Sequence, residues 1–242
     1  MGSPLEAIVR RRVSIDFASA KANGWHRRRR HIEDFCNVIS YTFPAGEAFF
    51  IDAMRAVEGR IADPELRGRI KDFIYQEAMH AKEHERCNRV LDRTCSYGPR
   101  IERLAVGLLK VCRLYPRSTQ LAIGCALEHM TAVFSDHMLR TQKTFIGSTD
   151  PAFAALWLWH AVEETEHKAV CVDVYRSVAG RGLFSYLQRV VFMFLTSLVF
   201  LAVVLVASGW SRKAAPPAAP AAGAPKGDGG AAKPKDLSLI HI

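Results

Sequence analysis

The chain has 242 residues, of which 49% are hydrophobic and 24% are charged, and its formal net charge is +9. This length is enough for one sizeable hydrophobic core, or for a domain with an appendage. The basic balance favours an anionic partner, either a membrane surface or a nucleic acid, but it does not discriminate between folds.

Six cysteines are scattered along the chain without a CxxC pair. The N-terminal residues carry no apolar stretch of the kind found in secretory signals. We therefore expect reduced thiols in a reducing compartment, which excludes a disulfide framework and places the folded part of the chain in the cytoplasm.

Residues 1–43 are basic and weakly patterned, with arginine runs at residues 10–12 and in 26-HRRRRH-31. They predict an N-terminal arm that is either solvated or in contact with anionic lipid head groups. Nucleic-acid binding is disfavoured, because no stacking aromatic residues interleave the runs and no known nucleic-acid module surrounds them. We therefore expect membrane lipid, and no nucleic acid, among the partners.

From about residue 44 onward, proline, aspartate and glycine residues divide the chain into helical segments. Pro44 suits the first turn of a helix because its φ is already fixed. Asp63-Pro64 and Asp150-Pro151 each combine an N-cap with proline at the first helical position, and Ser118 is a further N-cap. The expected helices cover about 44–59, 64–94, 100–113, 118–144 and 151–180.

Four of these helices are long, and the short one at 100–113 lies between the second and third long helices. A connection of this length lets those two helices run parallel, as in ferritin-like bundles with one crossover. No segment shows the alternation of a strand. The predicted fold is therefore all-α, a ferritin-like four-helix bundle over residues 44–182 with a crossover helix.

An apolar run without a charged residue covers residues 190–210. About 20 such residues match the thickness of the hydrocarbon core of a bilayer. We interpret residues 183–210 as a membrane helix, with a helix buried in a homodimer interface as the alternative. Residues 211–242, rich in Ala, Pro, Gly and Lys, predict a disordered tail.

Each long helix carries a carboxylate in an apolar setting, and two of them carry it in an E-x-x-H pair. Glu47 lies on the first helix and Glu128 on the third. Residues three apart lie on one helical face, so each E-x-x-H pair can reach the same ion. Two helices with one Glu each and two with E-x-x-H match the di-metal pattern of ferritin-like bundles. The two pairs are Glu77 with His80 and Glu164 with His167.

Two further histidines lie on these faces. His160 is four residues before Glu164, and we expect it to be a ligand as well. His84 follows Glu77 by seven residues and is either a ligand or a group that supports the ligands. Glu163 and Glu166 point away from the arc, and we interpret them as outer-face charges or as supporting groups.

The segments 43-FPAGEAFFIDAMR-55, 76-QEAMHAKEHERCN-88 and 159-WHAVEETEHKAVCVDVY-175 resemble the bacterial family of predicted metal-dependent hydrolases. More distantly, the chain is similar to the p-aminobenzoate N-oxygenase family of di-iron enzymes. That family's ligand order is Glu, E-x-x-H, Glu and H-x-x-x-E-x-x-H. The similarity implies seven ligands here: Glu47, Glu77, His80, Glu128, His160, Glu164 and His167.

The favoured function is a membrane-associated di-iron oxygenase that takes a small lipophilic substrate and an unidentified electron donor. The alternative is a dinuclear metal-dependent hydrolase. Iron oxidation or storage is less favoured because a membrane segment does not suit a soluble cage, and a non-catalytic helical protein would leave the whole constellation unused. The carboxylate and imidazole ligands suit two iron ions, with manganese or zinc as other choices.

Overall fold

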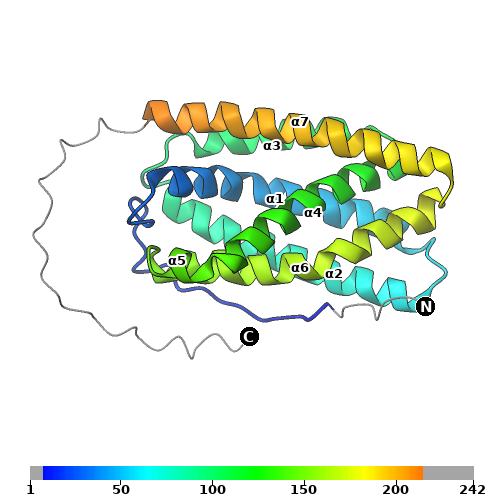
Figure 1. Cartoon of the computed structure of the whole chain (residues 1–242), viewed down its shortest axis with the longest axis horizontal. Coiled ribbons are helices and arrows are strands. Elements are labelled where there is room, and N and C mark those ends of the chain that lie inside the picture. Colours follow the sequence, from blue (N-terminus) through cyan, green and yellow to red (C-terminus); the bar gives the residue numbers. More distant parts are fainter. Residues whose placement is uncertain (1–7, 215–242) are drawn as a thin grey trace, which may run out of the picture.

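The computed structural model describes residues 8–214, and these residues form seven helices and no strand. The helices are α1 (Arg30–Glu58), α2 (Pro64–Leu91), α3 (Gly98–Cys112), α4 (Arg117–Arg140), α5 (Gln142–Ile146), α6 (Pro151–Ala179) and α7 (Leu183–Ala214). Most of the long helices run lengthwise, and α4 crosses them obliquely, as Figure 1 shows. Residues 211–214 of the predicted tail belong to the last helix, so the prediction was wrong there, and the rest of the tail lies outside the described residues.

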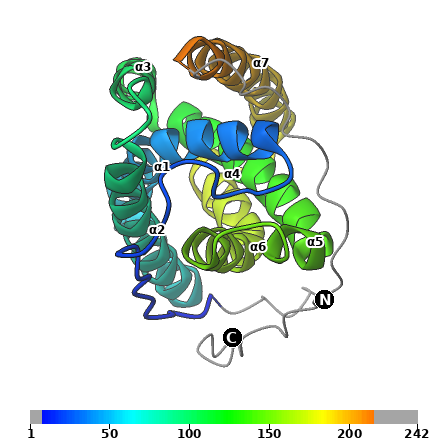
Figure 2. The same cartoon turned by 90° about the vertical axis from the view of Figure 1, so that its left-hand side faces the viewer.

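Helices α1, α2, α4 and α6 form the four-helix bundle. α1 packs on α2, α4 packs on α6, and the two pairs meet through α2 with α6 and α1 with α4. Figure 2, which looks along the bundle, shows α3 and α7 outside it. α3 connects α2 to α4 and packs against α1. The predicted all-α, ferritin-like bundle with a crossover helix is therefore confirmed.

The predicted start signals of two helices are confirmed by their hydrogen bonds. The Asp63 side chain accepts from the N–H of Glu65 at 2.9 Å. The Asp150 side chain accepts from the N–H of Ala152 at 3.1 Å. Proline at the first helical position follows each aspartate, where its missing N–H costs nothing. Ser118, in contrast, lies inside the first turn of α4 and does not cap it.

The first helix begins at Arg30 rather than at Pro44, which lies inside α1. The prediction was wrong because the buried apolar face starts well before the proline, at Cys36. A proline inside a helix leaves the carbonyl four residues earlier without its N–H partner. Here the side-chain amide of Asn88 donates to that carbonyl, the oxygen of Ser40, at 3.1 Å. A side chain of α2 thus completes the hydrogen bonding of α1.

Residues 8–29 pack against the bundle, so the solvated-arm interpretation is wrong for this part. Trp25 is buried and stacks on Phe153 at a ring separation of 4.5 Å. Arg11 reaches the carboxylate of Glu166 on α6 at 2.6 Å. We call residues 8–17 the N-terminal strap, because they run across α2 and α6. The strap covers one side of the bundle.

α7 runs lengthwise along the outside of the bundle and packs on α4 and α1 (Figures 1 and 2). Its inner side touches the core through Phe200 and Val204. Its outer side leaves large apolar side chains exposed, Phe194, Leu198 and Leu201 among them. Among the described helices, α7 meets the length and composition of a membrane span, with a mean hydropathy of 2.9.

Candidate metal centre

The bundle brings the seven predicted ligand residues together in two buried groups. The ligand atoms of each group lie within 4.8 Å of one another. We call these the three-residue group and the four-residue group. The first contains Glu47, His80 and His160, and the second contains Glu77, Glu128, Glu164 and His167.

Helical spacing explains how each helix contributes. The Glu77–His80 pair of α2 is three residues apart and faces the bundle interior. On α6, residues 160, 164 and 167 follow at steps of four and three, so they form one inward stripe. α1 and α4 add one buried glutamate each, Glu47 and Glu128. Since the four helices pack around one axis, the four faces converge.

The two groups meet at the carboxylates of Glu164 and Glu77. The Oε1 atom of Glu164 lies 3.1 Å from His160 Nε2 and 3.5 Å from His80 Nδ1, both in the three-residue group. The same oxygen lies 3.5 Å from His167 Nδ1 in its own group. Glu77 Oε1 lies 2.8 Å from His167 Nδ1 and 3.9 Å from His80 Nδ1. The two groups therefore form one continuous cluster.

Many of the buried ligand atoms lack a hydrogen-bond partner among the described residues. They are Glu47 Oε2, both oxygens of Glu77 and of Glu128, His80 Nδ1, His160 Nε2 and His167 Nδ1. Buried polar atoms are nearly always paired, and an unpaired one costs about 1–3 kcal/mol. Four carboxylates and three imidazoles without a thiolate suit iron, manganese or zinc. The residues therefore fit a metal centre.

Burial and mutual charge set the protonation of the cluster. Burial raises the pKa of Glu128 to about 7 and that of Glu77 well above its usual value. Burial also opposes ionisation of Glu164, but the imidazoles of His160 and His167, 3.1 and 3.5 Å from its Oε1, hold its pKa well below the usual range. Burial lowers the pKa of His167, but its carboxylate neighbours, Glu77 foremost, raise it well above the usual value. Without a metal, the cluster therefore retains protons that a cation must displace.

Each histidine of the cluster directs one nitrogen inward and bonds the other nitrogen to a partner. His80 Nε2 lies 3.0 Å from Glu163 Oε2. His167 Nε2 lies 2.6 Å from Gln76 Oε1. Such outer partners fix the ring orientation and leave the inner nitrogen without a proton, as a metal requires.

The orientation of Gln76 is fixed independently of His167. Its Nε2 donates to the carbonyl of Val9 and to Glu166, each at 2.9 Å. The amide oxygen must therefore face His167 and accept from Nε2–H. Sequence reasoning missed Gln76. The only signal was its position next to Glu77 in the Q-E-x-x-H segment.

Glu163 and Glu166 are supporting groups rather than outer-face charges. Glu163 is fully buried against His80, and Arg11 of the strap lies 3.5 Å from its other oxygen. Glu166 is half-buried and pairs with the same arginine at 2.6 Å. Burial raises the pKa of Glu163 to about 7. The strap thus contacts the partners of two ligand histidines.

His84 lies outside both groups and supports His160 instead. Its Nε2 is 2.9 Å from His160 Nδ1, and its Nδ1 is 2.9 Å from Ser40 Oγ. Ser40 donates its own proton to Asn88 Oδ1 at 2.6 Å, so its oxygen accepts from His84. Burial lowers the pKa of His84 well below its usual value, which keeps the ring neutral. Of the two interpretations from sequence, the supporting role fits the structure.

Apolar rings enclose the cluster and exclude water. Phe43 stacks on His160 at 4.5 Å, and Phe73 meets the edge of His167 at 4.6 Å. One neutral donor, the hydroxyl of Thr131, reaches Glu164 Oε2 at 2.6 Å. This setting is of low polarity, so charges inside it interact more strongly than in water.

The fold and the site together define a helical-bundle protein with a buried carboxylate–histidine cluster that could hold metal ions. A family model described as predicted metal-dependent hydrolase matches residues 9–219. The chain therefore belongs to the family of predicted metal-dependent hydrolases, and that resemblance is confirmed. No curated protein and no solved structure matches the chain significantly.

Proposed function

We propose that the chain is a membrane-associated dinuclear metalloenzyme whose cluster binds two ions, iron by preference, and oxygenates a small lipophilic substrate. The observation that carries the proposal is the pair of interlocked ligand groups, joined through Glu77 and Glu164. In this assignment all seven residues would hold the ions, and Glu77 and Glu164 contact histidines of both groups.

Charge balance supports two divalent ions. The cluster holds four carboxylates, and two divalent cations would neutralise them when all four are ionised. A neutral cluster avoids the large cost of a net charge in a buried site. Bound ferrous ions would supply electrons to O₂, and a separate donor would restore them.

The chain's own residues position and protect this chemistry. Glu163, Gln76 and His84 hold the ligand histidines in one tautomer. Phe43 and Phe73 keep water from the ligand rings. Thr131 holds one oxygen of Glu164, which leaves the other oxygen between the two groups.

Hydrolysis is the second candidate, and the family description favours it. A hydrolytic centre would bind a metal-activated water, which needs open coordination positions. If Glu77 and Glu164 are counted for both ions, each ion would have four or five protein ligands, whereas a catalytic zinc ion has about three. We therefore place oxygenation first on the donor set and keep hydrolysis as the alternative.

Membrane attachment through α7 is part of the proposal. The exposed outer side of α7 is apolar over most of its length. Large exposed apolar patches indicate contact with a membrane or a partner protein. The surface offered by α7 would give the enzyme access to lipophilic compounds, with the metal domain on the cytoplasmic side.

Metal counting and oxygen uptake separate the two reactions. The full-length protein is purified with ferrous iron without oxygen, its metal content is counted, and O₂ is then admitted. We expect about two irons per chain, rapid O₂ consumption and a new visible absorption band. Retention of zinc in preference to iron, with no O₂ consumed, would overturn the oxygenase proposal and favour hydrolysis.

A further inference from the structure

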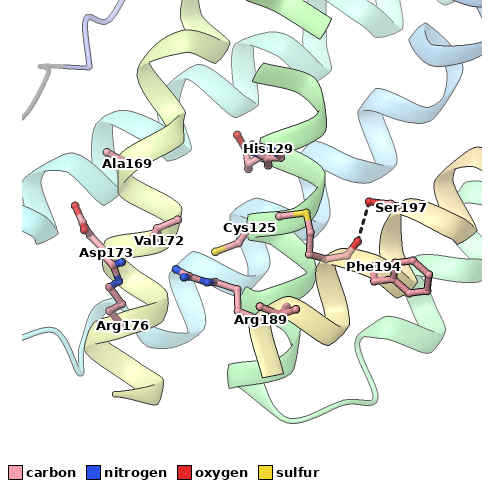
Figure 3. Close-up of a pocket in the computed structure, with 12 residues that line it drawn as sticks. Cys125, His129, Ala169, Val172, Asp173, Arg176, Arg189, Phe194 and Ser197 are labelled. Atoms are coloured by element: carbon pink, nitrogen blue, oxygen red, sulfur yellow. Dashed lines mark hydrogen bonds between the residues drawn. The ribbon is translucent and has the colours of Figure 1, made fainter. Parts of the chain in front are cut away.

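A cavity of about 860 Å³ lies between α4, α6 and α7 (Figure 3). It is within the range of small-molecule sites, roughly 300–1,000 Å³. One of its lining residues is Glu128, a member of the four-residue group. The cavity therefore reaches from the surface beside α7 to the flank of the four-residue group.

Apolar side chains form most of the cavity wall. Val172 comes from α6, and Met193 and Phe194 come from α7. Ser197 also faces the cavity, but its hydroxyl donates to the carbonyl of Met193 at 2.7 Å (Figure 3). Its proton is used within the helix. This wall suits a hydrocarbon chain better than a polar molecule.

Two arginines, Arg176 of α6 and Arg189 of α7, line the same cavity. In Figure 3 the side chain of Arg189 extends from α7 toward α6, and that of Arg176 runs along α6 beside Asp173. Within residues 8–214, neither guanidinium forms an ion pair, and the nearby Asp173 pairs with Arg69 at 3.0 Å instead. Asp173 also lines the cavity, but its ion pair is with Arg69, so both guanidinium groups can bind carboxylate or phosphate oxygens of a ligand.

The cationic and metal ends of the cavity are separated along α6. Ala169 lines the cavity two residues after His167, whose Nδ1 lies 3.5 Å from Glu128. Arg176 lines the cavity seven residues after Ala169. At the rise of an α-helix this separation is roughly 10 Å. A medium-length alkyl chain spans such a distance when its head group is at the arginines.

We propose that this cavity binds the substrate, an anionic amphiphile with a carboxylate or phosphate head group. Arg176 and Arg189 bind the head group, Val172 and Met193 line the alkyl chain, and the far end of the chain lies against Glu128. The role of the amphiphile as a substrate rests on the proposed function, whereas its binding to the cavity does not. A free fatty acid and an anionic membrane lipid share this chemistry.

Direct binding tests the head-group part of the proposal. Full-length, metal-loaded protein in phosphatidylcholine nanodiscs is titrated with dodecanoate, dodecyl phosphate and dodecanol. We expect both anions to bind about tenfold or more tightly than the alcohol. The R176Q/R189Q variant should lose this preference while its affinity for dodecanol stays unchanged. Equal affinity of the native protein for all three ligands would overturn the proposal.

Matched variants locate the ligand within the protein. Arg103, an exposed arginine of α3, gives the control R103Q, which should keep the native preference. Val172→Trp fills the proposed cavity and should abolish binding. Leu108→Trp fills a separate apolar cavity of about 350 Å³ between α1, α3, α4 and α7 and should leave binding intact. Loss of binding in Leu108→Trp alone would contradict the assignment.

The orientation of the ligand has its own readout. With Mn²⁺ in the protein, nuclear relaxation of labelled dodecanoate should be fastest at the terminal methyl group and slowest at the carboxylate. The reverse order would overturn the proposal. If phosphatidylglycerol in the nanodisc competes with dodecanoate, the natural ligand is a membrane lipid. If it does not compete, the natural ligand is a free amphiphile. If the native protein binds dodecanoate but consumes no O₂, the proposed oxygenase reaction is wrong and the binding site stands. If it consumes O₂ but does not bind dodecanoate, the binding site is wrong and the oxygenase reaction stands.

Discussion

The Nε2 atom of His84 lies 2.9 Å from the Nδ1 atom of His160, and this contact decides which nitrogen of each ring carries a proton. Ser40 accepts from the other nitrogen of His84 because its own proton goes to Asn88. His84 therefore accepts from His160, whose Nε2 is left with a free lone pair that points at the cluster. His84, which lies outside both groups, thus fixes the tautomer of His160.

Replacing His84 with alanine should weaken metal binding at the three-residue group by about 10- to 100-fold, the usual cost of losing a ligand's outer partner. The four-residue group should bind as before. Metal titration with counting of bound ions measures both affinities. His137→Ala, at an exposed position of α4, is the control. An unchanged titration in the His84 variant would contradict the supporting role.

Glu164→Gln should impair both metal positions, because Glu164 Oε1 contacts histidines of both groups. Glu47→Gln should impair the three-residue group alone. The expected metal content is well below one ion per chain in the first variant and about one in the second.

The metal content of the His160→Ala variant should also fall to about one ion per chain. Full metal content and oxygen reactivity in that variant would remove the analogy with the N-oxygenases.

Metal affinity should fall as the pH drops below about 7. Burial raises the pKa of Glu128 to about 7, so below this value the carboxyl holds a proton that the metal must displace. The loss is up to tenfold per pH unit for each proton released. Glu163→Gln, which keeps an acceptor for His80, should retain this slope. A flat profile in that variant would assign the proton to Glu163.

The fold, the ligand positions and their order could be predicted from sequence, because they depend on spacing within single helices. Glu77 and His80 lie on one face whatever surrounds them. The outer partners depend on how different helices meet. Glu163 contacts His80 across the α2–α6 interface, and no local pattern records that meeting. Pro44 was misread for a related reason, since the compensating donor, Asn88, lies on another helix.

Asn88 and Pro44 form a compensating pair that a double-mutant cycle can test. Asn88→Ala leaves the Ser40 carbonyl without its donor, and we expect a loss of about 1–3 kcal/mol in unfolding free energy. Pro44→Ala restores the backbone N–H and should make the asparagine less important. Chemical unfolding of the metal-free protein gives the four free energies. Strictly additive effects would show that the two residues do not compensate each other.

Asparagine substitutions at Leu198 and Leu205, exposed on α7, should move the protein from the membrane to the soluble fraction without reducing its melting temperature. Exposed side chains contribute little to folding, whereas an apolar surface in lipid loses its transfer energy when made polar. Val133→Asn, exposed on α4, is the control. A native chain that is soluble and dimeric, and becomes monomeric with these substitutions, would instead place α7 in a homodimer interface.

The N-terminal strap has a consequence for the order in which the molecule is completed. Arg11 bonds to Glu163 and Glu166, partners more than 150 residues further along the chain. Proteins are synthesised from the N-terminus, so the strap leaves the ribosome long before α6 exists to receive it. Until α6 is made, the side of the bundle that the strap later covers stays open. Because α6 supplies His160, Glu164 and His167, the strap can close over the cluster only after all seven of its residues have been made.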